Sequence, residues 1–232
     1  ASRTVPFVSK ATGVPLAKLA ARVMAGEKLA ELGLPDDERR LDYFSVKEAV
    51  MPFGRFPGAD VVLGPEMKST GEVMGIARNF PAAYTKTQLA ISYALPSGGT
   101  AFLSVNDRDK RELVPIARDI ARLGFSIAAT EGTARALRAV GVECEEIGKI
   151  HEGSSSIMDR IAAGEISFMI NTPFGTATRG DGYELRMAAV RHGVTYVTTL
   201  AGAQAMVAGM EVVRDAGLKV IALQDLPQHV AE

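Results

Sequence analysis

Hydrophobic and polar residues follow a regular order in the second half of the chain, where short apolar runs alternate with stretches of helical periodicity. The apolar runs predict six strands, at 101–105, 125–130, 143–147, 166–170, 195–198 and 220–223. The stretches between them predict five helices, at 109–123, 133–140, 157–163, 183–192 and 203–215. Strands that alternate with helices of about 10–15 residues form parallel sheets covered on both faces. The pattern therefore predicts an α/β fold with a doubly wound parallel sheet at 93–232.

The first 92 residues lack this regularity. We expect them to contain two helices, one extended segment and one glycine-rich ordered loop, at 15–26 (or on to Gly33), 81–94, 43–50 and 63–75. Pro96-Ser97-Gly98-Gly99 then interrupts both kinds of periodic structure. The sequence therefore predicts a mainly helical and irregular segment at 1–92, followed by a separate domain at 93–232.

Composition restricts the class of protein. The 232 residues are 47% hydrophobic, with a net charge of −1 and a single cysteine, Cys144. This balance of charge argues against nucleic acid as a partner. The sequence has no apolar run of about 18 residues and no export signal, so we expect no membrane span and a cytoplasmic location. The chain opens with Ala1 instead of methionine, and we interpret it as part of a longer polypeptide.

Polar residues follow the predicted strands at the points where the strands end. Because the carboxyl ends of parallel strands meet at one edge of a sheet, we expect these residues to gather there. In chain order, strand by strand, they are Ser104, Asn106, Asp107, Arg108 and Lys110; Thr130, Glu131, Gly132 and Thr133; Lys149 and His151; Asn171, Thr172, Pro173, Phe174 and Gly175; and Thr198 and Thr199.

This set of residues suits a phosphate group. Thr130 and Thr133 offer hydroxyl donors, Gly132 permits close approach of the backbone, and the following helix offers free N–H groups. Lys110 and Lys149 would balance the charge of the anion, while Asn171 could contact a sugar or a base. Each feature also has a plainer explanation: Thr-x-Gly-Thr serves equally as a helix cap, and either lysine as a solvated side chain.

Other kinds of chemistry find little support in the sequence. The three histidines, His151, His192 and His229, and the single cysteine have no metal-ligand spacing. Ser154-Ser155-Ser156 is typical of a helix cap and does not follow a strand in the manner of a serine hydrolase. Neither a Walker-type loop nor a Gly-x-Gly-x-x-Gly motif is present. The sequence therefore indicates a binding module with no catalytic residues and no metal site of its own.

Two long runs resemble a known family. "ASRTVPFVSKATG" at 1–13 is similar to the end of the second ATP-grasp unit in carbamoyl-phosphate synthetase large subunits, and "LGPEMKSTGEVMG" at 63–75 resembles a signature of the same subunit. The runs "SVNDRDK", "ATEGT", "GKIHEG" and "INTPFG" resemble its C-terminal regulatory domain. The resemblance implies a methylglyoxal-synthase-like, Rossmann-like domain at 93–232, and the tail of the second ATP-grasp unit with a linker at 1–92.

The resemblance also implies a function. The family makes carbamoyl phosphate from bicarbonate, glutamine-derived ammonia and two ATP for arginine and pyrimidine synthesis, with Mg (or Mn) and K as cofactors. Its partners are a glutaminase small subunit and other large subunits, and its regulatory domain binds UMP or IMP. The family's magnesium-binding residues have no match here, so we expect this polypeptide alone to be non-catalytic. The residues that match the family's effector site are Ser104, Lys110, Thr130, Thr133, Lys149, Asn171, Thr172 and Asp181.

Several departures from the family's pattern limit these expectations. Pro173 stands where relatives often have a second threonine, and Thr176 and Ala177 replace basic residues, which weakens the case for tight UMP binding. Glu48 and Thr198 match residues that bind ornithine in some relatives, but Val197 replaces a neighbouring acid. An alternative is a methylglyoxal synthase-type lyase, although its Gly-Gly-Asp motif is absent, or another α/β domain that binds a phosphorylated ligand. A structural role for 1–92 also stays open.

Overall fold

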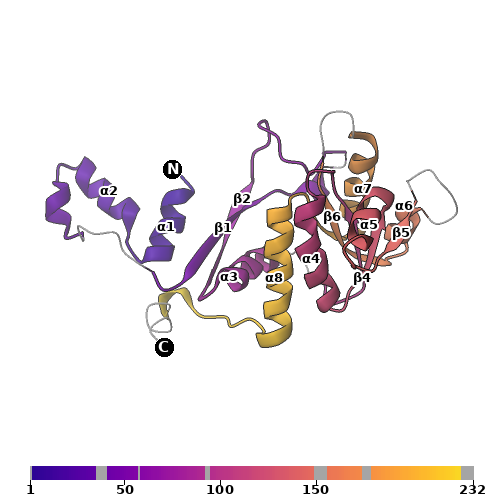
Figure 1. Ribbon diagram of the computed structural model, residues 1–232. Helices are drawn as coiled ribbons and strands as arrows, with labels where there is room; N and C mark the ends of the chain where they lie inside the picture. Colours follow the sequence, from indigo (N-terminus) through magenta and orange to yellow (C-terminus); the bar gives the residue numbers. More distant parts are fainter. Residues whose placement is uncertain are drawn as a thin grey trace.

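The computed structural model describes residues 2–34, 41–56, 58–91, 95–148, 156–173 and 179–225. Within them the chain forms a five-stranded parallel sheet covered by helices and a separate two-stranded antiparallel ladder (Figure 1). The sheet and the ladder come from different halves of the sequence.

The five-stranded sheet has the order β5-β4-β3-β6-β7. Its strands are β3 (Thr100–Ser104), β4 (Ser126–Thr130), β5 (Glu145–Ile147), β6 (Ile166–Asn171) and β7 (Thr195–Val197). All four neighbouring pairs are parallel. The chain moves outward from β3 to β5, returns to the other side of β3, and moves outward again. The predicted doubly wound sheet is therefore confirmed, with its switch point between β3 and β6.

Helices cover both faces of this sheet. The first face carries α4 (Lys110–Arg122), α5 (Glu131–Arg138) and α8 (Leu200–Ala216). The second carries α6 (Ile157–Ala162) and α7 (Arg179–His192). Alternate residues of β3 supply the two cores, with Ala101 and Leu103 on the first side and Phe102 on the second. Because its side chains pack into both cores, β3 is fixed between two layers of helices, and with it the carboxyl edge of the sheet.

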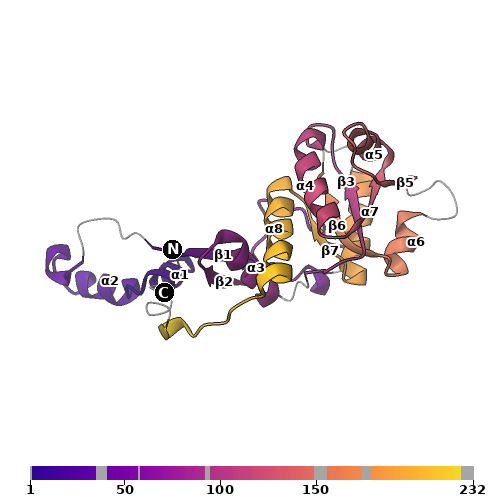
Figure 2. The ribbon, with the colours of Figure 1, turned by 60° about the horizontal axis from the view of Figure 1, so that its bottom comes forward.

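The first part of the chain centres on the two-stranded ladder. β1 (Phe44–Val50) pairs antiparallel with β2 (Gly71–Ala77), and α3 (Phe80–Ala90) packs against both strands. α3 also packs on α8, and α8 on α4, so that α8 lies between the two parts of the molecule in both Figure 1 and Figure 2. The remaining elements are α1 (Thr4–Thr12), α2 (Leu16–Met24) and short 3₁₀ turns at Leu29–Leu32, Phe53–Arg55 and Leu223–Asp225.

Some predicted elements are wrong. Residues 220–223 form no strand: 220–222 are irregular, Leu223 begins a 3₁₀ turn, and Val220 is 95% exposed. The stretch 63–75 is not all loop, because its last residues begin β2 in spite of their glycines. The helix predicted from Pro15 is confirmed and ends at Met24, close to Gly26, whereas α1 was not predicted. The other strand and helix predictions are confirmed to within a few residues at their ends.

Candidate functional site at the carboxyl edge of the sheet

The carboxyl ends of the three central strands bring most of the predicted effector residues together. β3 ends at Ser104, and its neighbours in the sheet are β4, which leads into Thr130–Thr133, and β6, which ends at Asn171. The sequence order β3, β4, β6 thus becomes the spatial order β4, β3, β6. The segment after β3 contacts both flanking loops, as the hydrogen bonds below show.

Thr133 connects the start of α5 to the segment after β3. It is 1% exposed, and its Oγ1 accepts a hydrogen bond from the backbone N–H of Val105, at 3.3 Å. The hydroxyl of Thr130 donates to the same oxygen, at 3.2 Å. A threonine oxygen that accepts in this way still has its own proton to donate. Thr133 is therefore fixed in place with a donor to offer.

Thr172 makes the matching contact on the other side of β3. Its Oγ1 accepts from the backbone N–H of Asn106, at 3.1 Å, and from the Asn106 side-chain amide, at 3.0 Å. Its own N–H donates to the carbonyl of Ser104, at 3.2 Å. Thr172 is 7% exposed. Two buried threonines thus hold two successive backbone N–H groups after β3, each keeping a hydroxyl proton.

Lys110 brings positive charge to this edge from the start of α4. Its Nζ lies so close to Gly132 that a Cβ built there would be 2.8 Å from it. Lys110 pairs with Asp107, at 2.6 Å, and this contact holds the pKa of Asp107 below its usual value. Asp107 is almost fully exposed, so this surface pair contributes little to stability. An anion could therefore replace Asp107 at small cost.

The helix-cap explanation for Thr130 fails in the structure. Thr130 occupies the N-cap position of α5, but its side chain makes no capping hydrogen bond, because the hydroxyl turns to Thr133. The first N–H groups of α5 are thus left without the cap that would compete with a ligand. By contrast, Ser156 caps α6 through Asp159 N, and Thr199 caps α8 through Gly202 N. The predicted cap at Ser156 is confirmed.

The structure does not describe several of the predicted residues. Lys149 and His151 lie outside the described residues, as do Thr176 and Ala177. Asp181 belongs to the first turn of α7, but its side chain is outside the described part of the structure. Their roles stay predictions.

Arg186 is a residue of this edge that sequence reasoning missed. It lies in α7, is 2% exposed, and donates from Nη1 to the Oδ1 of Asn171, at 2.8 Å. The signal in the sequence was an arginine next to Leu185 and near Ala188 and Ala189, on the apolar face of a helix. A buried arginine requires a partner, but a single sequence does not say which one.

The chain is similar to several known proteins. Residues 112–198 match the MGS-like domain family. Over 97% of its length the chain is 52% identical to the "Carbamoyl phosphate synthase large chain, C-terminal section" of Methanopyrus kandleri and to the large chain of Methanothermobacter thermautotrophicus. It is also 52% identical to the large chain of Pasteurella multocida, over 99% of its length. The chain corresponds to the C-terminal section of carbamoyl phosphate synthase large chains. It spans 43% of the Methanopyrus relative and 21% of the other two.

The likeness to carbamoyl phosphate synthase large chains extends well beyond the MGS-like domain. Coverage of 97% includes most of the first part of the chain, with β1, β2 and α3, as well as 112–198. A lone methylglyoxal synthase-type domain would leave this first part unexplained.

Glu48 and Thr198, the two matches to an ornithine site, lie in different elements. Glu48 is in β1, and its Oε2 accepts hydrogen bonds from Thr87 and Gln88 of α3. Thr198 follows β7, just before the cap of α8. Because α3 packs on α8, both residues belong to elements near the contact between the two parts. The two hydrogen bonds of the Glu48 carboxylate lead to α3 and not to Thr198, so this pairing stays a prediction.

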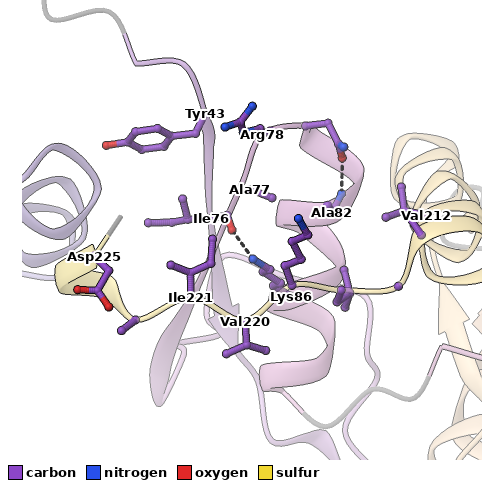
Figure 3. Close-up of a pocket in the computed structure, with 16 residues that line it drawn as sticks. Tyr43, Ile76, Ala77, Arg78, Ala82, Lys86, Val212, Val220, Ile221 and Asp225 are labelled. Carbon is purple, nitrogen blue, oxygen red and sulfur yellow. Dashed lines mark hydrogen bonds between the residues drawn. The ribbon is translucent and has the colours of Figure 1, made fainter. Parts of the chain in front are cut away.

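A cavity of about 950 Å³ lies away from the carboxyl edge, between β2, α3 and residues 216–225 (Figure 3). Among the described residues, its lining shares none with the predicted effector site. Inside the cavity Lys86 donates from Nζ to the carbonyl of Ile76, at 2.7 Å, and burial lowers its pKa. Val220 and Ile221 of the exposed tail form much of the opposite wall. The cavity mixes cationic and apolar groups and points to no single ligand class.

Three further features of the described residues bear on other functions. Among the described residues, no group of acidic, histidine and cysteine side chains has the arrangement of a metal site. No described helix is both long and apolar enough to cross a membrane. Cys144 precedes β5 instead of lying inside it, and burial raises the pKa of its thiol. A thiol with a raised pKa is a poor nucleophile.

Proposed function

We propose that this chain is the effector-binding, regulatory part of a carbamoyl phosphate synthase large chain, and that a nucleoside monophosphate binds at the carboxyl edge of its parallel sheet. UMP and IMP are the candidate effectors. The phosphate would lie over Thr130, Gly132 and Thr133, and the nucleoside toward Asn171. The likeness to large chains over nearly the whole sequence supports the first statement. The arrangement of the edge supports the second.

The observation that carries the proposal is the pair of buried hydroxyls. Thr133 and Thr172 each accept a backbone N–H from the segment after β3, so their protons remain to be donated. They are 1% and 7% exposed and therefore keep fixed positions. A phosphate offers only acceptors when ionised. A site that presents preorganised donors from two flanking loops suits such a ligand better than it suits a cation.

Charge at the edge adds to this preference. The dipole at the start of α5 contributes about 0.3–1 kcal/mol toward an anion. Lys110 is only 23% exposed along its side chain and reaches Gly132 at that helix start. A charge-assisted hydrogen bond from it would contribute on the order of 1.5–3 kcal/mol. Lys149 would add a second cation, if it lies where the strand order suggests.

The proposal extends to the whole protein. Such a large chain would join bicarbonate, glutamine-derived ammonia and two ATP into carbamoyl phosphate in the cytoplasm, with Mg or Mn, K and a glutaminase small subunit. The part described here would supply regulation, and its isolated polypeptide would hydrolyse no ATP. Bicarbonate-dependent ATP turnover by the purified polypeptide would contradict this assignment of roles.

Equilibrium dialysis with radiolabelled UMP and IMP tests the site. Lys110→Met removes the cation beside Gly132, whereas Arg111→Met removes an exposed cation from the next position of the same helix. We expect Lys110→Met to weaken binding at least tenfold and Arg111→Met to change it less than twofold. Thr133→Ser, which keeps the hydroxyl, should bind more tightly than Thr133→Val. Equal affinity of Lys110→Met and Arg111→Met would place the phosphate elsewhere.

A further inference from the structure

Arg186 joins the carboxyl edge to a segment more than a hundred residues away in the sequence. Its Nε and Nη2 donate to the two carboxylate oxygens of Asp60, at 2.8 and 2.7 Å, and its Nη1 donates to the Oδ1 of Asn171, at 2.8 Å. The guanidinium side chain is 3% exposed. The buried guanidinium group of Arg186 therefore binds the Asp60 carboxylate on one side and the Asn171 amide on the other.

This contact decides how Asn171 faces its surroundings. An arginine can only donate hydrogen bonds, so the amide atom that meets it must be the oxygen. The amide nitrogen then points the other way, and it donates to the carbonyl of Ser104, at 3.3 Å. An amide nitrogen carries two protons. Asn171, which is 5% exposed, is thus held with its oxygen toward Arg186 and its amide nitrogen toward Ser104, so that the group left to meet a ligand at this edge would be N–H.

Close packing leaves this arrangement little freedom. Gly182, one turn before Arg186 in α7, lies so near that a Cβ on it would be 2.9 Å from Arg186 Nη1 and 3.5 Å from Asn171 Oδ1. The residue next to Asp60, Val61, is 4% exposed. Asp60 itself accepts the backbone N–H of Val62, at 3.2 Å. Arg186, Asp60 and Asn171 are therefore each held from a second direction.

α7 has another link to the same segment, which supplies a control. The hydroxyl of Tyr183 donates to the carbonyl of Gly58, at 2.9 Å. This bond ties α7 to residues 58–62 just as Arg186 does, but nothing in it touches Asn171. Both links join α7 to residues 58–62, but the Tyr183 link is a single exposed hydrogen bond, whereas Arg186 forms a buried ion pair and also contacts Asn171.

We propose that Arg186 is a positioning residue of the effector site: anchored by Asp60, it fixes the Asn171 amide as a hydrogen-bond donor toward the ligand. The proposal rests on the function proposed above. Asp60, in the first part of the chain, would then contribute to ligand affinity through Arg186 and Asn171, without touching the ligand itself. The proposal also predicts that the ligand atom at Asn171 is an acceptor, such as a carbonyl, hydroxyl or phosphate oxygen.

Variant titrations test the role through affinity. Binding of UMP and IMP is measured calorimetrically for the parent, Arg186→Lys, Arg186→Met, Asp60→Asn and Tyr183→Phe, with the melting temperature of each. We expect Arg186→Met to weaken binding at least tenfold, Arg186→Lys less, and Tyr183→Phe less than twofold. A parent that binds while Arg186→Met binds equally well overturns this proposal alone. A parent that binds neither nucleotide overturns the proposed function with it.

A spectroscopic measurement separates positioning from general destabilisation. The side-chain amide signals of Asn171 in a ¹⁵N-correlation spectrum, assigned by their loss in Asn171→Asp, report the orientation of the amide in the free protein. In the parent and in Tyr183→Phe we expect both proton shifts to lie away from those of a solvent-exposed asparagine side chain. In Arg186→Met they should move toward the solvent-exposed values. Unchanged signals in Arg186→Met would show that something other than Arg186 orients Asn171.

Discussion

Gly75 of β2 lies so close to Ala83 of α3 that a Cβ on Gly75 would overlap the carbonyl oxygen of Ala83. The contact joins two backbones directly, without side chains between them, and both residues are buried. Because α3 also packs on α8, this approach sets the distance between the β1–β2 ladder and the rest of the molecule.

Gly75→Ala should therefore destabilise the fold strongly. Backbone atoms cannot rotate away as a side chain can, so the helix must shift, and overpacking of this kind costs about 1–3 kcal/mol or more. Gly64→Ala is the control, because a Cβ at Gly64 meets nothing within 4 Å. Urea unfolding of both variants measures the difference. Equal unfolding midpoints would show that β2 and α3 pack less tightly than described.

Gly132→Ala, unlike Gly75→Ala, should lose nucleotide binding and little of its folding stability. The methyl group would meet the Nζ of Lys110, which is the free end of a flexible side chain and can move. It would also fill the space through which a phosphate approaches the start of α5. Nucleotide titration and thermal melting of the same sample separate the two effects, with Glu131→Ala at the exposed neighbouring position as control. Unimpaired nucleotide binding by Gly132→Ala would contradict the placement of the phosphate.

Thr172→Val should cost stability even without ligand. The substitution keeps the shape of the side chain but leaves the backbone N–H and the side-chain amide of Asn106 without their acceptor. Unsatisfied donors of this kind cost about 1–3 kcal/mol. Thr172→Ser keeps the oxygen and should lose much less. If the two variants unfold at the same urea concentration, the hydroxyl of Thr172 does not hold the segment after β3.

The stability contributed by Asp60 should depend on pH in a defined direction. Arg186 beside it lowers the pKa of the Asp60 carboxyl in the folded chain. The stabilisation is therefore fully present above the unfolded-state pKa of about 3.9 and is lost as the pH falls through the lower folded pKa. At pH 7 we expect Asp60→Asn to lose about 3 kcal/mol, as for other broken buried ion pairs.

Chemical unfolding of the parent and Asp60→Asn between pH 7 and pH 3 measures this dependence. The difference in unfolding free energy should shrink below about pH 4. Asp107→Asn is the control, because Lys110 also lowers the pKa of the Asp107 carboxyl, but this pair lies on the surface. The unfolding free energy of Asp107→Asn should differ little from that of the parent at any pH. If the difference in unfolding free energy between the parent and Asp60→Asn stayed constant with pH, the ion pair between Asp60 and Arg186 would be contradicted.

Periodicity and strand order explain why much of this fold was predictable. The apolar runs that became β3, β4 and β6 are bounded by glycines and helical stretches, so their type followed from local pattern alone. Their polar ends then had to meet, because the strands are parallel. Lys110, Thr130, Thr133, Asn171 and Thr172 gather for this reason.

Other features depend on contacts that no local pattern records. The strand at Gly71–Ala77 forms because β1 supplies its hydrogen bonds and Ala83 requires a glycine beside it, although its composition suggests a loop. The apolar stretch at 220–223 has strand composition, but it has no partner strand among the described residues, and no strand forms there. Arg186 was missed because its partner, Asp60, lies 126 positions away.

Calorimetric titration of the parent chain with UMP, IMP, uridine, inosine and inorganic phosphate tests the central claim most directly. We expect at least one nucleotide to bind below millimolar concentration, its nucleoside to bind far more weakly, and inorganic phosphate to compete with the nucleotide. Failure of both nucleotides to bind below millimolar concentration, or equal binding of nucleotide and nucleoside, would contradict a phosphate site at the carboxyl edge of the sheet.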